Sequence, residues 1–568
     1  MSTSATSAIQ TLRTLINNLG FTEEEKEALR KYFIGYEKRQ NDALTFLPDY
    51  TTNEAKLVFF RSLISTPEQP VAGNIPDVVS LKREFEQVVI QQVGSLRSEV
   101  KRVRYVAESW LSSPGFMTET EKGKQVRSIG TEMAFPFKLT TTQRRRGMRG
   151  RFQDQPDASE IEDVWQEYFI EECNELKGTR GTKLIVADTH LTPLLNTRKP
   201  DFVFIQNGRP LDPLNVAAVG EIRKRTSQAS QFANADVGHA IAFGEKVIQL
   251  QPRRQHVYVV LTDCIIITVY KITKTSDNQF TYQYTASENL QYVDSEPPTG
   301  WRYLMTIMES SPNELGWIEP SLNFDGVTVT LNRSISAGRT SIVYEGTDSN
   351  KELVVVKIAK KNEYLPCFEQ ERNALTQLSE LNSPHIPKLL LSNANTLVMT
   401  PLCMKVKNLR KEDIERIIET LKIVHSQYHI IHRDLRKYNF LRDDNGNILI
   451  ADWGYSVTEG DNMPFAGALE CMPDDVLESL DNNEAINYNP RMDLICLVRS
   501  LYLMFHNPVM ERFSFDKVLE NGNFKERLQE IKTFWSSHGN SSEWWATIYQ
   551  EANEANYDNL LRNLINFF

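Results

Sequence analysis

The chain has 568 residues, of which 40% are hydrophobic and 24% charged, and its formal net charge is −10. This balance is typical of globular proteins and excludes a mainly disordered or fibrous chain, while the length favours roughly two to four domains. Its longest apolar runs are too short to cross a membrane, and its six cysteines are scattered without a CxxC pair, so we expect an intracellular protein without a membrane contact or a zinc site.

Residues 1–155 are expected to form a mostly helical region that ends in a basic linker. Apolar residues recur at helical spacing within 23–36 and 78–110. Residues 95–151 hold thirteen Lys or Arg against five Glu. This surplus ends in a run that contains Arg144, Arg145, Arg146, Arg149 and Arg151. Such a run can bind nucleic-acid phosphates or a nuclear import receptor, and a solvated linker is the alternative.

Residues 156–310 alternate between helical and β-rich patterns. Helices are expected at 161–176 and 237–250, and strands at 256–262 and 264–272. This order predicts an α/β domain.

Two acidic residues of this domain, Asp201 and Glu221, lie next to β-rich runs. Their surroundings resemble the core of PD-(D/E)xK nucleases, in which an aspartate and a glutamate on adjacent strands hold Mg²⁺ beside a cation. The resemblance implies Asp201 and Glu221 as metal ligands, with Glu162 or Glu167 as a further carboxylate and Arg223 as the cation. Because arginine does not readily lose a proton, phosphate binding is expected more than cleavage. Alternatively, the two acids are ordinary charges at strand ends.

Beyond a polar stretch that is rich in proline, residues 320–568 begin with β-rich segments followed by a helix. The strand at 354–357 ends in Lys357, and the next helix carries Glu369 and Glu371. This arrangement resembles that of protein kinases, in which such a lysine has an anionic partner on the next helix, and the resemblance implies Glu371 as the partner, with Glu369 as the alternative.

The most specific motif follows downstream. His-Arg-Asp-Leu-Arg-Lys-Tyr-Asn occupies 432–439, and Asp-Trp-Gly occupies 452–454. Between them a strand at 447–451 follows an Asp-Asp-Asn-Gly turn, which predicts a short hairpin. These segments resemble the catalytic and magnesium-binding loops of protein kinases.

The resemblance implies a role for each polar residue of these loops. Asp434 would accept the proton of the substrate hydroxyl, with Arg436 beside it, while Asn439 and Asp452 would hold Mg²⁺ on ATP. The residue before Asp434, Arg433, is typical of kinases that activation-loop phosphorylation controls.

The resemblance also implies a nucleotide site formed by a phosphate-binding loop, a lysine and a hinge. Its candidate residues are Ser336, Gly338, Ser341, Val343, Lys357, Met399, Thr400 and Leu402. The loop departs from the family pattern, because serine replaces the two outer glycines and reduces the freedom of the backbone.

The expected fold is therefore multidomain, α+β and α/β, with a helical N-terminal region, a PD-(D/E)xK nuclease-like α/β domain and a bilobal kinase domain. The order of the last two domains is similar to that of crinkler-type effector proteins, which implies a nuclear site of action, inside host cells if the chain is secreted. The expected function is ATP- and Mg²⁺-dependent phosphorylation of serine or threonine, with tyrosine and the protein substrate left open. The alternative is a nucleic-acid-binding protein or Mg²⁺-dependent nuclease with a regulatory pseudokinase domain.

Overall fold

The computed structural model describes residues 26 and 29 and most of residues 117–566. Within that last range the gaps are 138–149, 158, 177–180, 197, 225–230, 277–278, 295, 339, 407, 462–464, 468, 483, 485, 506–523 and 539–541. The chain divides into two compact units, residues 1–100 and 101–568. Most of the predicted helical region and Arg144 to Arg149 of the basic run therefore lie outside the described residues.

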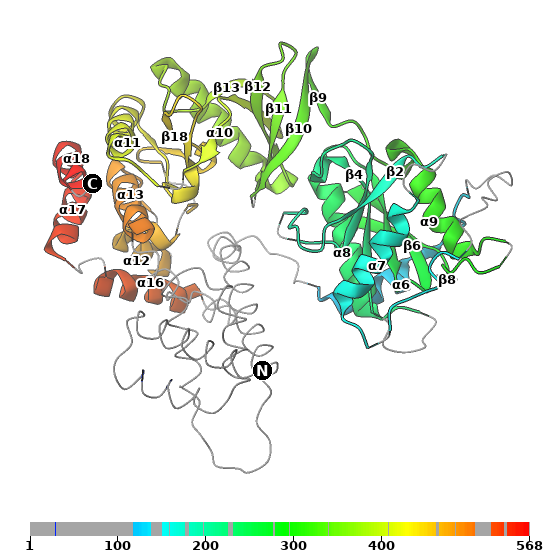
Figure 1. The fold of residues 1–568 in the computed structure, drawn as a ribbon. Coiled ribbons are helices and arrows are strands. Elements are labelled where there is room, and N and C mark those ends of the chain that lie inside the picture. The colour runs from blue at the N-terminus through cyan, green and yellow to red at the C-terminus, as the bar shows by residue number, and fades with distance from the viewer. Residues whose placement is uncertain are drawn as a thin grey trace, which may run out of the picture. The chain divides into compact units, whose positions relative to one another are not determined.

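The second unit begins with an α/β part, here called the middle domain (Figure 1). Its sheet has the strand order β1-β7-β6-β5-β4-β3-β2, and β8 pairs with β6. The strands are β1 (Thr131–Glu132), β2 (Leu184–Asp188), β3 (Phe202–Gln206), β4 (Val216–Ile222), β5 (His256–Thr262), β6 (Ile266–Ser276), β7 (Gln279–Tyr284) and β8 (Glu288–Asn289). The helical segments are α6 (Glu119–Ile129), α7 (Glu162–Asn174), η3 (Pro213–Asn215), α8 (Asn234–Leu250), α9 (Thr299–Glu309) and η4 (Pro312–Leu315).

Both faces of this sheet are covered. Side chains alternate along a strand, so Phe202 and Phe204 of β3 share one apolar core with α7 and α9, while Val203 and Ile205 share another with α8. All seven residues of β4 are buried because both faces of this strand are covered. The predicted helices at 161–176 and 237–250 and the strand at 256–262 are confirmed.

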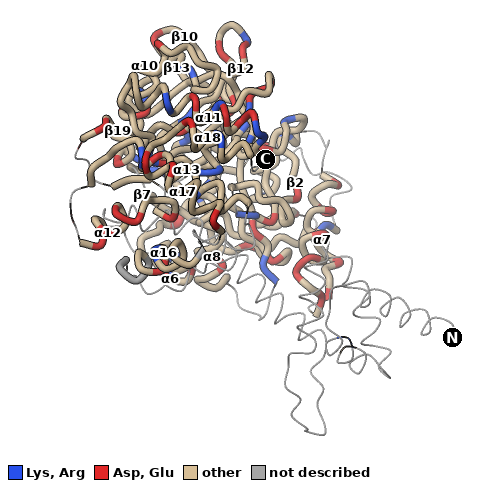
Figure 2. Tube along the Cα trace, turned by 90° about the vertical axis from the view of Figure 1, so that its left-hand side faces the viewer, with Lys and Arg blue, Asp and Glu red and all other residues tan. Residues whose placement is uncertain are grey.

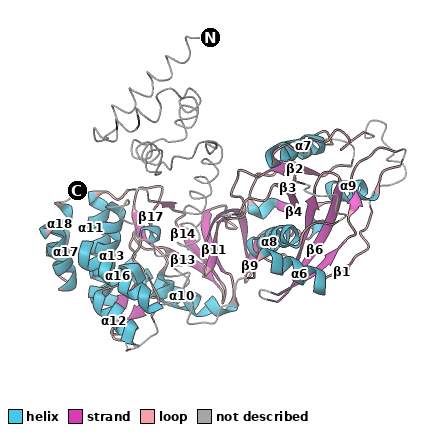
Figure 3. Cartoon of the chain, turned by 90° about the horizontal axis from the view of Figure 1, so that it is seen from below, coloured by secondary structure: helices cyan, strands magenta, loops and turns pink. Residues whose placement is uncertain are grey.

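The middle domain includes residues before position 156, the boundary expected from the sequence. Strand β1 pairs in parallel with β7, and α6 lies beside α8 (Figure 3). The two helices approach closely at Gly123 and Gly238, where an added Cβ would lie 1.8 Å from a backbone oxygen of the other helix. Only glycine fits at these crossing points.

A C-terminal domain follows, and its upper lobe is a six-stranded antiparallel sheet with one helix. The strand order is β13-β14-β12-β11-β10-β9, and α10 (Leu365–Leu378) packs on one face. The strands are β9 (Ser321–Phe324), β10 (Val327–Ala337), β11 (Ser341–Thr347), β12 (Leu353–Ala359), β13 (Lys388–Ser392) and β14 (Thr396–Thr400).

The lower lobe of this domain is mainly helical (Figure 3). Its helices are α11 (Lys411–Ile423), α12 (Asp474–Asn482), α13 (Pro490–Phe505), α16 (Phe524–His538), α17 (Glu543–Asn553) and α18 (Tyr557–Ile565). Its short strands are β15 (Met404–Lys405), β16 (Ile430–Ile431), β17 (Phe440–Arg442), β18 (Ile448–Ile450) and β19 (Val457–Thr458). Strands β17 and β18 form the predicted hairpin. Across the described residues, no helix combines the length and hydropathy that a membrane crossing requires.

Candidate active site

Lys357 lies between two carboxylates. Its Nζ is 2.5 Å from Oε2 of Glu371 on α10 and 2.7 Å from Oδ1 of Asp452, which follows β18. Glu369, the alternative partner, is exposed. Burial opposes the charge of Lys357, but Asp452 and Glu371 outweigh it, so that the pKa of the lysine is raised. The lysine is therefore a fixed cation that points from the sheet toward Asp452.

Asp434 is held by the two residues predicted to accompany it. Arg436 contacts both of its oxygens, with Nε 2.5 Å from Oδ1 and Nη2 2.9 Å from Oδ2. Asn439 donates from Nδ2 to Oδ2 at 2.9 Å and to the Asp434 carbonyl at 2.7 Å. This orientation keeps the amide oxygen of Asn439 available for a metal ion. Burial opposes the charge of Arg436, but Asp434 and Glu470 raise its pKa well above the usual value.

His432 and Asp493 fix the backbone around Asp434. Asp493, at the start of α13, accepts hydrogen bonds from the backbone N–H groups of His432 and Arg433 at 2.6 and 2.7 Å. The His432 ring is fully buried, and this burial lowers its pKa. In its neutral form it accepts from the backbone N–H of Asp434 at 3.2 Å and donates to the Ala451 carbonyl at 3.1 Å. The histidine thereby ties the Asp434 loop to the loop of Asp452.

Arg433 is occupied by other parts of the chain. It is buried, its Nε donates to the Tyr455 carbonyl, and its guanidinium lies 4.7 Å from the centre of the Tyr488 ring. The motif predicted that Arg433 marks a kinase controlled by activation-loop phosphorylation. In the structure, its contacts include a backbone carbonyl and an aromatic ring.

The proposed nucleotide residues lie along β10, β11, β12 and β14. Ser336 and Gly338 are half-buried at the end of β10, Ser341 is buried at the start of β11, and Val343 lies opposite Lys357 in the strand register. Lys360 donates to the carbonyl of Gly338 and closes the turn.

The three hinge candidates occupy the end of β14 and the segment after it. Met399 is buried and packs in the core shared with α10, whereas Thr400 and Leu402 are half-buried. Met399 is therefore the one of the three that lies inside the lobe.

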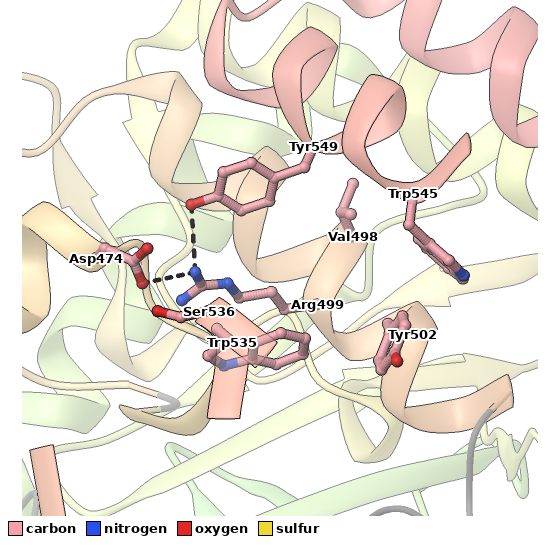
Figure 4. Close-up of a pocket in the computed structure, with 8 residues that line it drawn as sticks. All are labelled: Asp474, Val498, Arg499, Tyr502, Trp535, Ser536, Trp545 and Tyr549. Carbon is pink, nitrogen blue, oxygen red and sulfur yellow. Dashed lines mark hydrogen bonds and ion pairs between the residues drawn. The ribbon is translucent and has the colours of Figure 1, made fainter. Parts of the chain in front are cut away.

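A second buried arginine, Arg499 of α13, supports the segment that follows the Asp452 loop. Figure 4 shows its guanidinium beside Asp474 and Tyr549, with Nη2 at 2.7 and 3.2 Å from their oxygens. The guanidinium carbon of Arg499 lies 4.7 Å from the centre of the Trp535 ring. These residues line a small cavity of about 160 Å³ and fix the start of α12 against α13.

The comparisons with known proteins agree with this geometry. Residues 329–566 match the family model described as the protein kinase domain. This part of the chain is a protein kinase domain. It is the fold of a phosphotransferase, and Lys357, Glu371, Asp434, Asn439 and Asp452 occupy its characteristic order. Residues 162–254 match a model described as a domain of unknown function, DUF6826.

Known relatives of the chain are named as kinases. A probable serine/threonine-protein kinase of Dictyostelium discoideum is 23% identical over 428 residues, which cover 72% of this chain and 61% of that protein. The match therefore extends beyond the kinase domain. A dual specificity mitogen-activated protein kinase kinase of Caenorhabditis elegans is 32% identical over 85 residues, 15% of this chain and 20% of that protein. The chain spans less than two thirds of the length of either relative.

Among solved structures, vaccinia related kinase 3 matches with 16% identity and a TM-score of 0.33. The match covers 44% of this chain and 91% of that one.

The middle domain brings Asp201 and Glu221 together on neighbouring strands. Asp201 precedes β3 and accepts the backbone N–H of Ile222 on Oδ2 at 2.7 Å. Arg223 lies beside Glu221, with Nη2 2.6 Å from Oε1 of Glu221 and Nη1 3.1 Å from Oε1 of Glu162. A guanidinium therefore contacts the acidic side chains that a metal ion would need.

Of the other polar residues around Asp201 and Glu221, some contact the pair and some do not. Glu167 is exposed, and Gln166 instead donates to the Asp201 carbonyl at 2.6 Å. His239 of α8 approaches Glu221 at 3.4 Å. Among the described residues, no group of three or more His, Cys, Asp or Glu side chains is arranged to hold a metal ion.

The buried acidic pair predicts an unusual pH dependence of stability. Burial raises the pKa of Glu221 to about 9, with a further contribution from Asp201, and burial raises the pKa of Asp201 to about 6. Unfolded carboxyl groups titrate near about 4. Between these values the folded protein holds more protons than the unfolded chain, so the free energy of unfolding falls as the pH rises from about 5 to 9.

Replacing Glu221 with glutamine removes the main titrating group, so the melting temperature of the variant should change less between about pH 6 and 9 and exceed that of the wild type at the alkaline end. Calorimetry of the full chain at several pH values measures this. Glu167→Gln is the matched control, because Glu167 is exposed. If the melting temperature of Glu221→Gln falls with pH as steeply as that of the wild type, Glu221 is not the main titrating group.

Some functional contacts have no signal in the sequence. Glu470, 3.3 Å from Arg436, and Tyr488, beside Arg433, belong to no motif, and only the fold brings them to the catalytic loop. In the basic run, the described arginine, Arg151, lies 3.2 Å from Glu175. Figure 2 shows basic and acidic residues interspersed along the described chain.

Proposed function

We propose that the chain is a protein kinase that uses ATP and Mg²⁺ to phosphorylate serine or threonine hydroxyls of a protein. The observation that carries this proposal is the position of Lys357 between Glu371 and Asp452. In active kinases the lysine and the helix glutamate must be paired while the aspartate is placed for the metal. Here the three side chains meet, with Lys357 and Glu371 buried and Asp452 partly exposed.

The remaining chemistry follows from the catalytic loop. Asp434 accepts the proton as the substrate hydroxyl attacks the terminal phosphate, and Arg436 orients its carboxylate. Asn439 and Asp452 would hold Mg²⁺, which would neutralise charge on the phosphates of ATP. Lys357 would bind and orient these phosphates. The relative named as a probable serine/threonine-protein kinase supports these acceptors, and the dual specificity relative keeps tyrosine open.

Labelled ATP tests this function directly. The full chain with Mg²⁺ should transfer label to itself or to a general substrate such as casein, and acid hydrolysis should release labelled phosphoserine or phosphothreonine. Lys357→Ala should reduce incorporation by about 10²- to 10³-fold, because the phosphates lose a fixed cation. Lys388→Ala is the control, since Lys388 is exposed on the same sheet. No incorporation by the wild-type chain with any acceptor would reject the proposal.

We propose as a second candidate that the middle domain binds nucleic acid. The favouring observation is Arg223 beside Glu221, with Asp201 bonded to the backbone of Ile222 next to them, which resembles a nuclease core with its cation retained. Binding without cleavage is the form that this geometry supports. DNA and RNA digestion by the wild type, compared with Glu221→Ala, tests for cleavage, and a gel-shift assay with Arg223→Ala tests for binding. If the wild type and Arg223→Ala shift the nucleic acid equally, the proposed binding through this site is rejected.

The finer proposal is that the chain is a crinkler-like effector that acts inside cells, in the nucleus. The order of the two domains and the arginine run at 144–151 support it. A fluorescent fusion should enter the nucleus and remain outside it when Arg144, Arg145 and Arg146 are replaced with alanine. Equal distribution of both fusions would reject a nuclear signal at this run.

A further inference from the structure

The face of the kinase sheet opposite α10 is buried. Lys357 of β12 points toward α10, so its neighbours Val354 and Val356 point to the other face, as does Val398 of β14. All three valines have exposures of 1% or less. They belong to the same apolar core as Leu250 of the middle domain. The sheet that carries the nucleotide residues is therefore packed against the middle domain.

Two hydrogen bonds join the middle domain to the strands on either side of the phosphate-binding loop. The carboxylate of Asp212 accepts the backbone N–H of Ser334 on β10, with its oxygens at 3.2 and 3.3 Å. The hydroxyl of Tyr344 on β11 donates to the carbonyl of Leu250 at 2.8 Å. Ser334 and Tyr344 are partners in the strand register. Both bonds therefore hold the same rung of the hairpin.

This rung lies near the base of the loop. The β10–β11 register shifts between Ser334 and Ser336, and two further pairs, Ser336 with Val343 and Ala337 with Ile342, separate the rung from the turn that follows Ala337. At such an irregularity the ladder is locally disrupted and the strand bends. Fixing Ser334 and Tyr344 therefore fixes the base from which the loop reaches over a nucleotide.

The middle-domain ends of both bonds are rigid. Asp212 also accepts the backbone N–H of Leu214 at 2.9 Å and so begins η3. The Leu214 carbonyl accepts Nε1 of Trp317 at 2.7 Å. Leu250 ends α8, and its neighbour Gln251 is buried and bonded to the carbonyls of Pro213 and Val216. The two anchors thus belong to one hydrogen-bonded block.

We propose that Asp212 and Tyr344 are positioning residues of the nucleotide site, through which the middle domain holds the phosphate-binding loop. The inference rests on the proposed kinase function. It assigns to the middle domain part of the positioning of a loop whose outer positions are Ser336 and Ser341 in place of glycine. Nucleotide affinity is then a property of the two domains together.

Titration calorimetry of the full chain with MgADP and with MgATP tests the proposal. Asp212→Ala and Tyr344→Phe should each raise the dissociation constant about 3- to 10-fold, as expected for the loss of one hydrogen bond that orders the site. Asp212→Asn keeps an acceptor and should bind nearly as the wild type does. Asp163→Ala, on the exposed side of α7, is the control and should leave the constant unchanged.

Kinetics and hydrogen exchange separate this role from a loss of stability. The KM for ATP should rise in Asp212→Ala while the KM for the protein substrate stays constant, and amide exchange at 334–344 should accelerate. Equal nucleotide affinities and equal exchange in the wild type and both variants would overturn the inference. A wild-type chain that binds no nucleotide would instead reject the kinase function, while faster exchange at 334–344 in Asp212→Ala would still support the tether.

Discussion

Asp434→Asn should lower the rate of phosphate transfer by about 10²- to 10⁴-fold, the contribution typical of a positioned proton acceptor. The asparagine keeps the shape of the side chain and can still accept hydrogen bonds from Arg436 and Asn439, which contact Asp434 in the structure. It cannot take the proton of the attacking hydroxyl. The rate of label transfer from ATP at saturating nucleotide measures the loss.

The choice of variant matters because Asp434 is buried against a cation. Both Asp434→Asn and Asp434→Ala leave Arg436 with Glu470 as an acidic partner, but Asp434→Ala would also leave the donors of Arg436 and Asn439 without their acceptor, so its loss of stability would be larger. Nucleotide binding by Asp434→Asn should stay within a factor of about two of the wild type, since the base acts on the substrate hydroxyl. Asp558→Asn, which breaks an exposed pair with Lys422, should change neither quantity. A fully active Asp434→Asn would remove the assignment of the base.

The local sequence was enough to predict much of the catalytic centre. The pairing of Lys357 with Glu371 depends on a strand and a helix that adjoin in the chain, and the β17–β18 hairpin depends on a single turn. In both cases the residues that meet are close in sequence or belong to a motif with a fixed spacing. The roles proposed for these residues follow from the family pattern and await the activity measurements described above.

The contacts that sequence reasoning missed join distant segments. Asp212 and Ser334 are 122 positions apart, and neither residue carries a motif. Strand β1 has only two residues, too few for any periodicity, and its pairing with β7 depends on the rest of the sheet. In the same way, the presence of Arg223 over Glu221 follows from strand alternation, but its second bond, to Glu162, requires the helix to be in place.

Arg254→Met should destabilise the middle domain by about 3 kcal/mol or more, because buried acceptors would lose their donors. Arg254 is 2% exposed, and its contacts are to uncharged oxygens. Its five donor contacts, at 2.6 to 2.9 Å, go to the carbonyls of Val216, Ala217, His256 and Leu315 and to Oε1 of Gln251. Burial lowers its pKa to about 9, which still leaves the guanidinium charged at neutral pH.

The loss of Arg254 should also affect the contact between the middle domain and the kinase sheet. Arg254 joins the start of β4, the end of α8 and η4, and α8 ends at Leu250, whose carbonyl accepts the Tyr344 hydroxyl of the kinase sheet. Calorimetry of the full chain should therefore show a lower melting temperature for Arg254→Met. The melting temperature of Arg254→Lys should lie between those of the wild type and Arg254→Met, because an ammonium has three donors and no planar fork. Arg253→Met is the matched control, since Arg253 is exposed. Equal melting of Arg254→Met and Arg253→Met would show that the buried guanidinium does not stabilise the block that supports the nucleotide loop.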